Sequence, residues 1–89
     1  MKDNLDNWRK QIDVLDEKIL IHLAKRMNIS SKIGRFKKER GISTLDKKRW
    51  GQVLKSNLKQ GGKLGFSREF INDLLKLIHK YSLEVQEKN

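Results

Sequence analysis

Three features of the sequence predict an all-α fold with three helices per chain, the first long, the second short and the third of medium length. Apolar residues recur at steps of three and four, the period of amphipathic helices, and no segment alternates with the period of two that strands show. The 89-residue chain contains no proline, the residue that most strongly interrupts a helix. Hydrophobic residues make up only 36% of it, which favours burial shared between two chains over a small separate core. We expect a single domain over residues 1–89.

The first expected helix spans Leu5–Lys38 and governs the size of the molecule. Its 34 residues form a rod of about 50 Å, whereas a compact globule of this chain length is about 30 Å across. One chain cannot cover the apolar seam of such a rod, so we expect a partner chain to cover it. The seam consists of Leu5, Trp8, Ile12, Leu15, Ile19, Leu23, Ile29, Ile33 and Phe36.

Two shorter helices follow the long one. Gly41 comes directly after the basic run KKER and is suited to end the first helix in the left-handed conformation. Asp46 has the residue type of an N-cap, and the helix that it opens runs to about Gln60, where Gly61-Gly62 stops it. Ser67 caps a third helix that runs to about Gln86.

Composition excludes several classes of protein. Without cysteine the chain forms no disulfide and no thiolate metal site, which fits the reducing cytoplasm. No apolar run approaches the roughly 20 residues of a membrane span, so we expect no membrane contact. His22 and His79 lack the spacing of metal ligands, and we expect them to be structural and the protein to hold no metal. The net charge of +10 favours an anionic partner, either a polyanion or a small molecule.

Cations inside the apolar stripes are more informative than the total charge. Arg26 shares a heptad position with Leu5, and a guanidinium on a buried seam is costly unless it is paired. Lys37 follows eleven residues later, about 16 Å along the axis and about 20° around it, so both cations share a face. Two convergent cations leave room for a small dianion between them. The alternative is that Arg26 snorkels or pairs with an acidic residue of another helix.

Arg9 precedes Arg26 by 17 residues, about 25 Å on the same helix, so both cannot hold one small molecule within a chain. In an antiparallel pair of long helices, Arg9 of one subunit approaches Arg26 of the other. The alternative is a solvated arginine in the first turns of the helix.

Two further pairs of polar residues share helix faces. Asp46 and Arg49 are three apart, and they form either part of a binding site or a helix cap with a local ion pair. Ser82 and Gln86 are four apart and interrupt an apolar stripe. Their alternative is a serine bonded to its own helix backbone and a surface glutamine.

Four segments together resemble the all-helical class of chorismate mutases. They are RKQIDVLDEKILIHLAKRM, IGRFKKERGI, LDKKR and INDLLKLIHKYSLEVQ, and the resemblance covers about Leu5–Gln86 with helix order and loop lengths intact. It implies an intertwined homodimer in which the long helices pair and each active site takes the first-helix arginine from the partner subunit. The positions that match this family's binding or catalytic groups are Arg9, Arg26, Lys37, Asp46, Arg49, Ser82 and Gln86.

The resemblance implies the rearrangement of chorismate to prephenate, in phenylalanine and tyrosine biosynthesis, without cofactor or metal. Lys37 and Gln86 are then catalytic, because both donate hydrogen bonds to the ether oxygen of the breaking bond. Arg26 and Arg9 of the partner subunit are expected to bind the two carboxylates of the substrate, since their planar forks match carboxylate geometry.

The same resemblance assigns the rest of the substrate pocket. Asp46 is expected to hold the ring hydroxyl, with Arg49 and Ser82 completing the binding residues. Trp50 is a departure, because the family commonly has a glutamate there that helps to hold the hydroxyl, and an indole cannot accept that hydrogen bond.

Three other functions remain compatible with parts of the sequence. An isochorismate pyruvate lyase on the same scaffold would use the same cations on a similar dianion. A basic helical nucleic-acid-binding dimer would use the +10 charge, although it gives no reason for Arg26 on the seam. A non-catalytic helical dimer is compatible with Trp50. The expected partners are chorismate and a second copy of the chain, with no nucleic acid.

Overall fold

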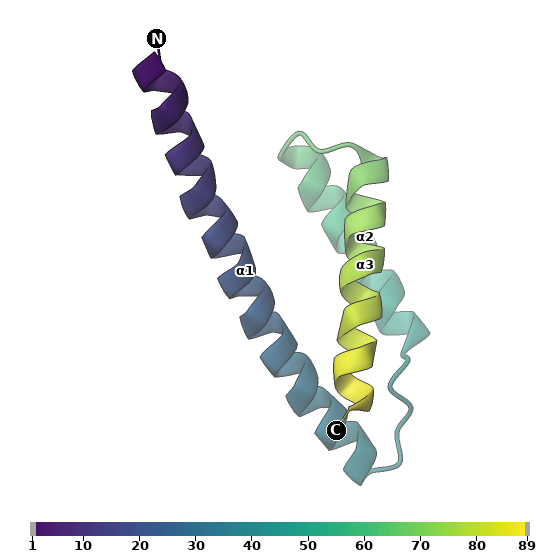
Figure 1. The fold of residues 1–89 in the computed structure, drawn as a ribbon. Coiled ribbons are helices and arrows are strands. Elements are labelled where there is room, and N and C mark those ends of the chain that lie inside the picture. The colour runs from purple at the N-terminus through teal and green to yellow at the C-terminus, as the bar shows by residue number, and fades with distance from the viewer. Residues whose placement is uncertain (1, 89) are drawn as a thin grey trace.

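The computed structural model describes residues 2–88 and contains three helices joined by short loops (Figure 1). Helix α1 spans Lys2–Glu39, α2 spans Lys47–Lys63 and α3 spans Arg68–Glu87. The described residues include no strand, so the predicted all-α class is confirmed. Helices α1 and α3 run in the same direction and α2 runs in the opposite direction (Figure 1), with α3 in contact with both other helices.

The predicted helix ends are formed by backbone and side-chain hydrogen bonds. Gly41 has φ 66°, the left-handed conformation expected after α1, and Ile42 N–H donates to the Lys37 carbonyl at 2.8 Å. Asp46 Oδ1 accepts from Arg49 N–H at 3.0 Å and opens α2. Ser67 likewise accepts from the N–H of the third residue after it and opens α3.

The predicted end of α2 is wrong by about a turn. The helix continues through Gly61-Gly62 to Lys63 and ends where Gly65 takes φ 90° and Phe66 N–H bonds back to the Gly61 carbonyl at 2.9 Å. Gly61 is buried, and a Cβ there would lie 2.5 Å from Cγ1 of Ile71. Gly61 therefore allows α2 to pack closely against α3, and the turn that ends α2 is made by Gly65.

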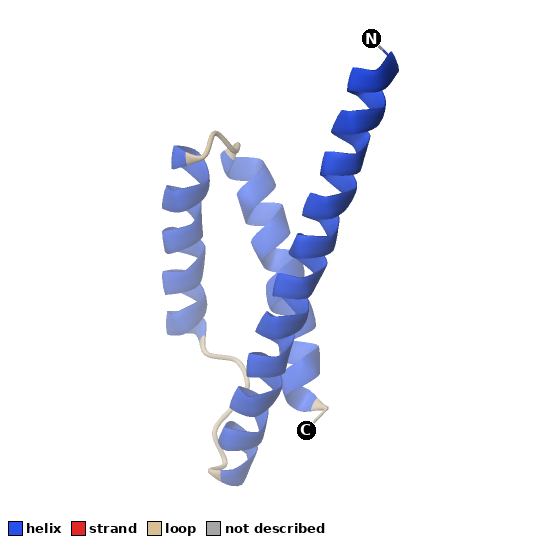
Figure 2. Ribbon diagram, turned by 90° about the vertical axis from the view of Figure 1, so that its left-hand side faces the viewer, coloured by secondary structure: helices blue, strands red, loops and turns tan. Residues whose placement is uncertain are grey.

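Helix α3 packs against both other helices and carries most of the small core. Its apolar residues Ile71 and Leu75 are each 6% exposed. The C-terminal half of α1 crosses α3, and α2 lies on the other side of it (Figure 2). The molecule measures 59 × 25 × 14 Å with a radius of gyration of 16.7 Å, well above the roughly 12 Å of a compact chain of this length.

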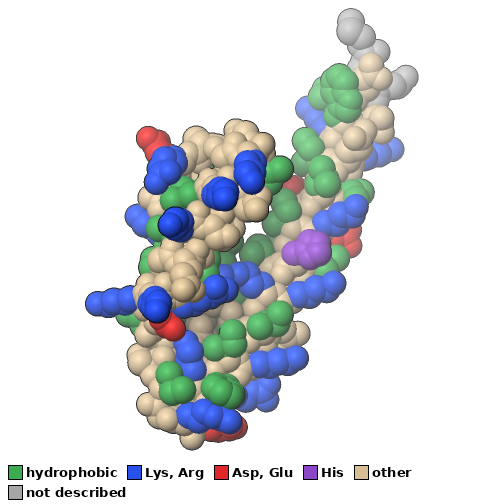
Figure 3. Space-filling view, turned by 180° about the vertical axis from the view of Figure 1, so that it is seen from behind, with side chains coloured by type: hydrophobic (Ala, Val, Ile, Leu, Met, Phe, Trp, Pro, Cys, Tyr) green, Lys and Arg blue, Asp and Glu red, His purple; other side chains and the backbone are tan. Residues whose placement is uncertain are grey.

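The N-terminal half of α1 diverges from the α2–α3 pair and its end extends beyond that pair (Figure 1), and its large apolar side chains are exposed. Trp8 is 59% exposed and Ile19 56%. Figure 3 shows hydrophobic side chains along this exposed rod, interspersed with lysine and arginine. The predicted seam is thus left largely uncovered by its own chain. No helix in the described part of the chain is long and apolar enough to cross a membrane.

Candidate active site

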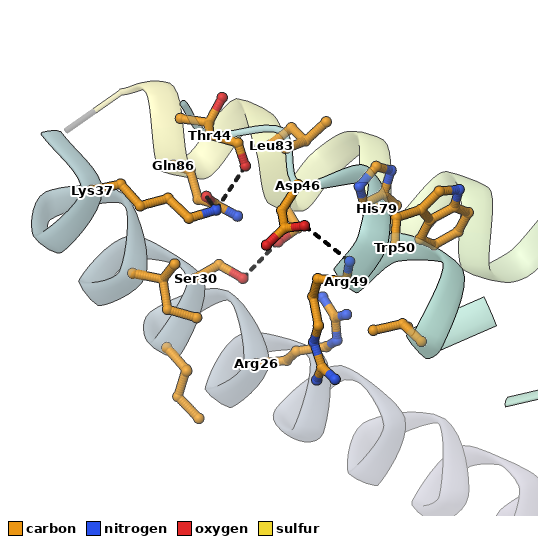
Figure 4. Close-up of a pocket in the computed structure, with 14 residues that line it drawn as sticks. Arg26, Ser30, Lys37, Thr44, Asp46, Arg49, Trp50, His79, Leu83 and Gln86 are labelled. Carbon is orange, nitrogen blue, oxygen red and sulfur yellow. Dashed lines mark hydrogen bonds between the residues drawn. The ribbon is translucent and has the colours of Figure 1, made fainter. Parts of the chain in front are cut away.

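A cavity of about 360 Å³ lies where the C-terminal halves of α1 and α3 meet the start of α2. Residues from all three helices and from the loop before α2 line it (Figure 4). Six of the seven predicted site residues are brought together here, although they are spread over 61 positions of the sequence from first to last. They are Arg26, Lys37, Asp46, Arg49, Ser82 and Gln86.

Lys37 is held in place at one end of the cavity. Its Nζ donates to the Thr44 carbonyl oxygen at 2.8 Å and to Gln86 Oε1 at 3.3 Å (Figure 4). An ammonium has three N–H donors, so one remains for a ligand. Because Gln86 accepts with its oxygen, its amide nitrogen keeps two N–H donors of its own. The loop before α2 is tied down as well, since the Thr44 hydroxyl donates to Glu87 Oε1 at 3.0 Å.

Gly34 allows α1 and α3 to meet closely enough for this contact. A Cβ at position 34 would lie 2.5 Å from the carbonyl oxygen and 2.6 Å from the Cα of Gln86, both backbone atoms of α3. Only glycine fits such a close approach. This role was not predicted from the sequence, where its signal is a lone glycine in an otherwise uninterrupted long helix.

Ser82 is bonded across helices to another buried serine. Its Oγ lies 2.6 Å from Oγ of Ser30 on α1, and the two residues are 6% and 5% exposed. Two hydroxyls carry two protons and this bond uses one, so the other remains available to a ligand in the cavity that both residues line. Ser30 is a pocket residue that the sequence analysis missed, because its partner lies 52 residues away.

Two arginines line the cavity with no acidic partner. In residues 2–88 the only ion pair within 4 Å joins Arg40 and Glu39, and it lies outside the cavity. Arg26 therefore has no ion pair with an acidic residue of another helix, which was one of its two alternative interpretations. Its side chain and that of Arg49 extend toward the same part of the cavity (Figure 4). Like charges held together in this way favour an anion between them.

The comparison with known protein families agrees with this chemistry. The sequence pattern of the family described as chorismate mutase type II matches residues 8–87. The chain belongs to the chorismate mutase type II family. Searches of curated proteins and of solved structures found no match to the chain. The mutase is accordingly an isomerase that rearranges chorismate to prephenate.

The seventh predicted residue of the mutase lies outside this cavity. Arg9 is exposed on the N-terminal half of α1, in the part of the rod that extends beyond the other helices. The expected distance of about 25 Å from Arg26 along the axis agrees with this separation. The chain alone thus holds only part of the predicted set.

At the other end of the mutase's cavity, two aromatic rings stack. The rings of Trp50 and His79 have centroids 4.1 Å apart and an angle of 16° between their planes. Partial burial, followed by the nearby charge of Arg26, lowers the pKa of His79 below its ordinary value of 6.5. His79 is thus a pocket residue that sequence reasoning had assigned a structural role.

Proposed function

We propose that the cavity between the three helices is the active site of the mutase, and that a second copy of the chain completes it. The observation that carries this proposal is the contact of Lys37 with Gln86, at the end of a cavity lined by unpaired arginines. It joins the two groups expected at the ether oxygen of the substrate. The absence of cysteine supports a cytoplasmic enzyme of phenylalanine and tyrosine biosynthesis.

The reaction asks two things of such a site. The rearrangement is unimolecular, so the substrate must be held in the folded conformer in which the reacting carbons meet. The ether C–O bond breaks as the new C–C bond forms, and negative charge builds on the ether oxygen. Donors already aimed at that oxygen stabilise the transition state more than the ground state.

Lys37 and Gln86 supply those donors. The Lys37 ammonium and the Gln86 amide meet at one end of the cavity, where their remaining N–H groups can serve one ligand atom (Figure 4). The bond to the Thr44 carbonyl holds the ammonium before substrate arrives, so little reorganisation is needed during the reaction.

The arginines bind and fold the substrate. Arg26 and Arg49 lie in one cavity without acidic partners, and each guanidinium can pair with a carboxylate through two parallel hydrogen bonds. Arg9 of the partner subunit is proposed to hold the second carboxylate. The exposed apolar rod of α1 supports this arrangement, because a second rod that covers the seam would carry its own Arg9 toward the cavity.

Chorismate turnover tests the proposal directly. Loss of chorismate absorbance with prephenate as the product is expected from the purified protein. Lys37→Met is expected to lower kcat by about 100- to 1,000-fold with little change in KM, because a donor aimed at developing charge is lost. The matched control is Lys38→Met, which changes the adjacent exposed lysine outside the cavity.

Two outcomes would contradict the proposed site. An equal loss of kcat in both lysine variants would show that Lys37 does not act at the reacting bond. Pyruvate release from isochorismate without any prephenate from chorismate would indicate the lyase on this scaffold.

A further inference from the structure

The polar groups of the substrate can be matched one by one to the groups that line the cavity. Chorismate carries two carboxylates, one ether oxygen in the breaking bond and one ring hydroxyl. Arginines serve the carboxylates, and Lys37 with Gln86 serves the ether oxygen. The hydroxyl is the remaining polar group, and a hydroxyl both donates and accepts hydrogen bonds.

His79 lines the cavity with a side chain that can both donate and accept a hydrogen bond, as a hydroxyl requires. No hydrogen bond joins its imidazole to another residue in the range 2–88, and no side-chain nitrogen or oxygen there is both buried and unpaired. Its unpaired nitrogens are therefore accessible. With its pKa lowered, the ring is neutral at pH 7 and offers one N–H donor and one nitrogen acceptor.

The position of His79 agrees with that of a hydroxyl next to the ether. Asp46 lies between the Lys37–Gln86 pair and the imidazole (Figure 4). In chorismate the carbon that carries the hydroxyl adjoins the carbon that carries the ether oxygen. A substrate with its ether at Lys37 and Gln86 can therefore place its hydroxyl near Asp46 and the ring beyond it.

Trp50 fixes the orientation of that ring. The near-parallel stack at 4.1 Å covers one face of the imidazole and leaves the ring edge, which carries the nitrogens, uncovered by the indole. The indole N–H is a donor only, so Trp50 cannot itself replace an acceptor. Its contribution acts through His79.

We propose that His79, positioned by the stacked indole of Trp50, hydrogen-bonds the ring hydroxyl of the substrate together with Asp46 and thereby selects the hydroxylated ring. The inference rests on the proposed function, because it takes the substrate from it. His79 touches the substrate, whereas Trp50 is a positioning residue.

The test compares chorismate with the analogue in which hydrogen replaces the ring hydroxyl. His79→Phe keeps an aromatic ring for the stack and removes both polar atoms, and His79→Gln keeps a donor and an acceptor. We expect His79→Phe to lower kcat/KM for chorismate by about tenfold, the usual effect of one lost hydrogen bond, and to leave kcat/KM for the analogue within about threefold. His79→Gln is expected to recover most of the loss.

Variants of Trp50 test whether the indole positions the imidazole of His79 or contributes only to packing. Trp50→Phe keeps an aromatic face and is expected to retain the preference for chorismate over the analogue. Trp50→Leu is expected to reduce that preference toward the value of His79→Phe, because the imidazole is no longer held. Thermal unfolding and sedimentation of each variant show that the fold and assembly persist.

Each outcome has a separate meaning. No conversion of chorismate by the unmodified protein would overturn the proposed function. If the unmodified protein converts chorismate, but His79→Phe lowers kcat/KM equally for chorismate and the analogue or lowers neither, only the role of His79 would be overturned. Loss in His79→Gln equal to that in His79→Phe would overturn the hydrogen bond.

Discussion

At the scale of single residues, the unpaired state of Arg26 leads to a first prediction. Its guanidinium is half-buried on the seam of α1, and no acidic residue in the described range lies within 4 Å of it. Partial removal of an unpaired charge from water destabilises the protein, so the residue is expected to serve binding at the expense of stability. We predict that Arg26→Leu abolishes mutase activity and leaves the melting temperature without ligand unchanged or higher. Steady-state kinetics and thermal unfolding check both parts, and a clear fall in melting temperature would contradict a binding role.

His79 leads to a second prediction, about stability and pH. Its pKa in the folded protein is lowered, first by burial and then by Arg26, so the unfolded chain takes up a proton at higher pH than the folded one. Folding is therefore weakened as pH falls from above 6.5 through the lowered pKa of the folded state, and is unaffected by this group at higher pH. We predict that the melting temperature falls more between pH 7.5 and 5.5 in the unmodified protein than in His79→Gln. Equal falls in the two proteins would contradict the lowered pKa.

The pocket residues that were predicted from the sequence differ from those that were missed in the kind of sequence signal that each gives. Arg26 and Ser82 are polar residues within apolar stripes, a pattern that one helix shows by itself. Ser30 and His79 take their places only through contacts with Ser82 and Trp50, which lie on other helices. Such contacts depend on the rotation and register of one helix against another, and no local period reports them.

At the scale of helices, Gly34 sets how closely α1 and α3 approach. A methyl group at this position would meet backbone atoms of Gln86, which cannot turn aside as a side chain can. We predict that Gly34→Ala destabilises the protein by about 1–3 kcal/mol and lowers kcat, because the helices separate and carry Lys37 away from Gln86. Chemical denaturation and turnover measure the two effects.

Gly62 provides the matched control for this change. It lies within α2, and a Cβ there would meet no atom of the described residues within 4 Å. Alanine is the better helix former by about 1 kcal/mol, so Gly62→Ala is expected to be neutral or stabilising and to retain full activity. Gly34→Ala with the same stability and turnover as Gly62→Ala would show that α1 and α3 do not need this close approach.

Helix ends show where local sequence was sufficient and where it was not. The caps at Asp46 and Ser67 involve bonds within three residues, and both were predicted. The end of α2 was misplaced because Gly61 is needed inside the helix, against Ile71 of α3. A glycine that permits helix contact and a glycine that ends a helix have the same sequence signal, and only the packing separates them.

At the scale of the whole molecule, the length of α1 connects stability with catalysis. Its N-terminal half bares apolar residues that include Trp8, Ile12 and Ile19, and the core of the single chain is small. Burial of such a seam contributes about 25 cal/mol per Å², and two chains that cover each other's seams gain this twice. The proposed partner therefore supplies burial as well as Arg9.

Subunit mixing distinguishes a shared site from a site within one chain. We predict that Arg9→Ala and Arg26→Ala are each nearly inactive alone as homodimers. After the two are unfolded together in equal amounts and refolded, half of the dimers are expected to be mixed, by random pairing. Each mixed dimer has one site with both arginines and one site with neither. About a quarter of the unmodified activity per chain should return, because one site in two is restored in half of the dimers. Arg9→Ala mixed with the unmodified protein gives the control for refolding yield. If each site instead took both arginines from its own chain, mixing would restore nothing, and the long helix would have to be explained by packing alone.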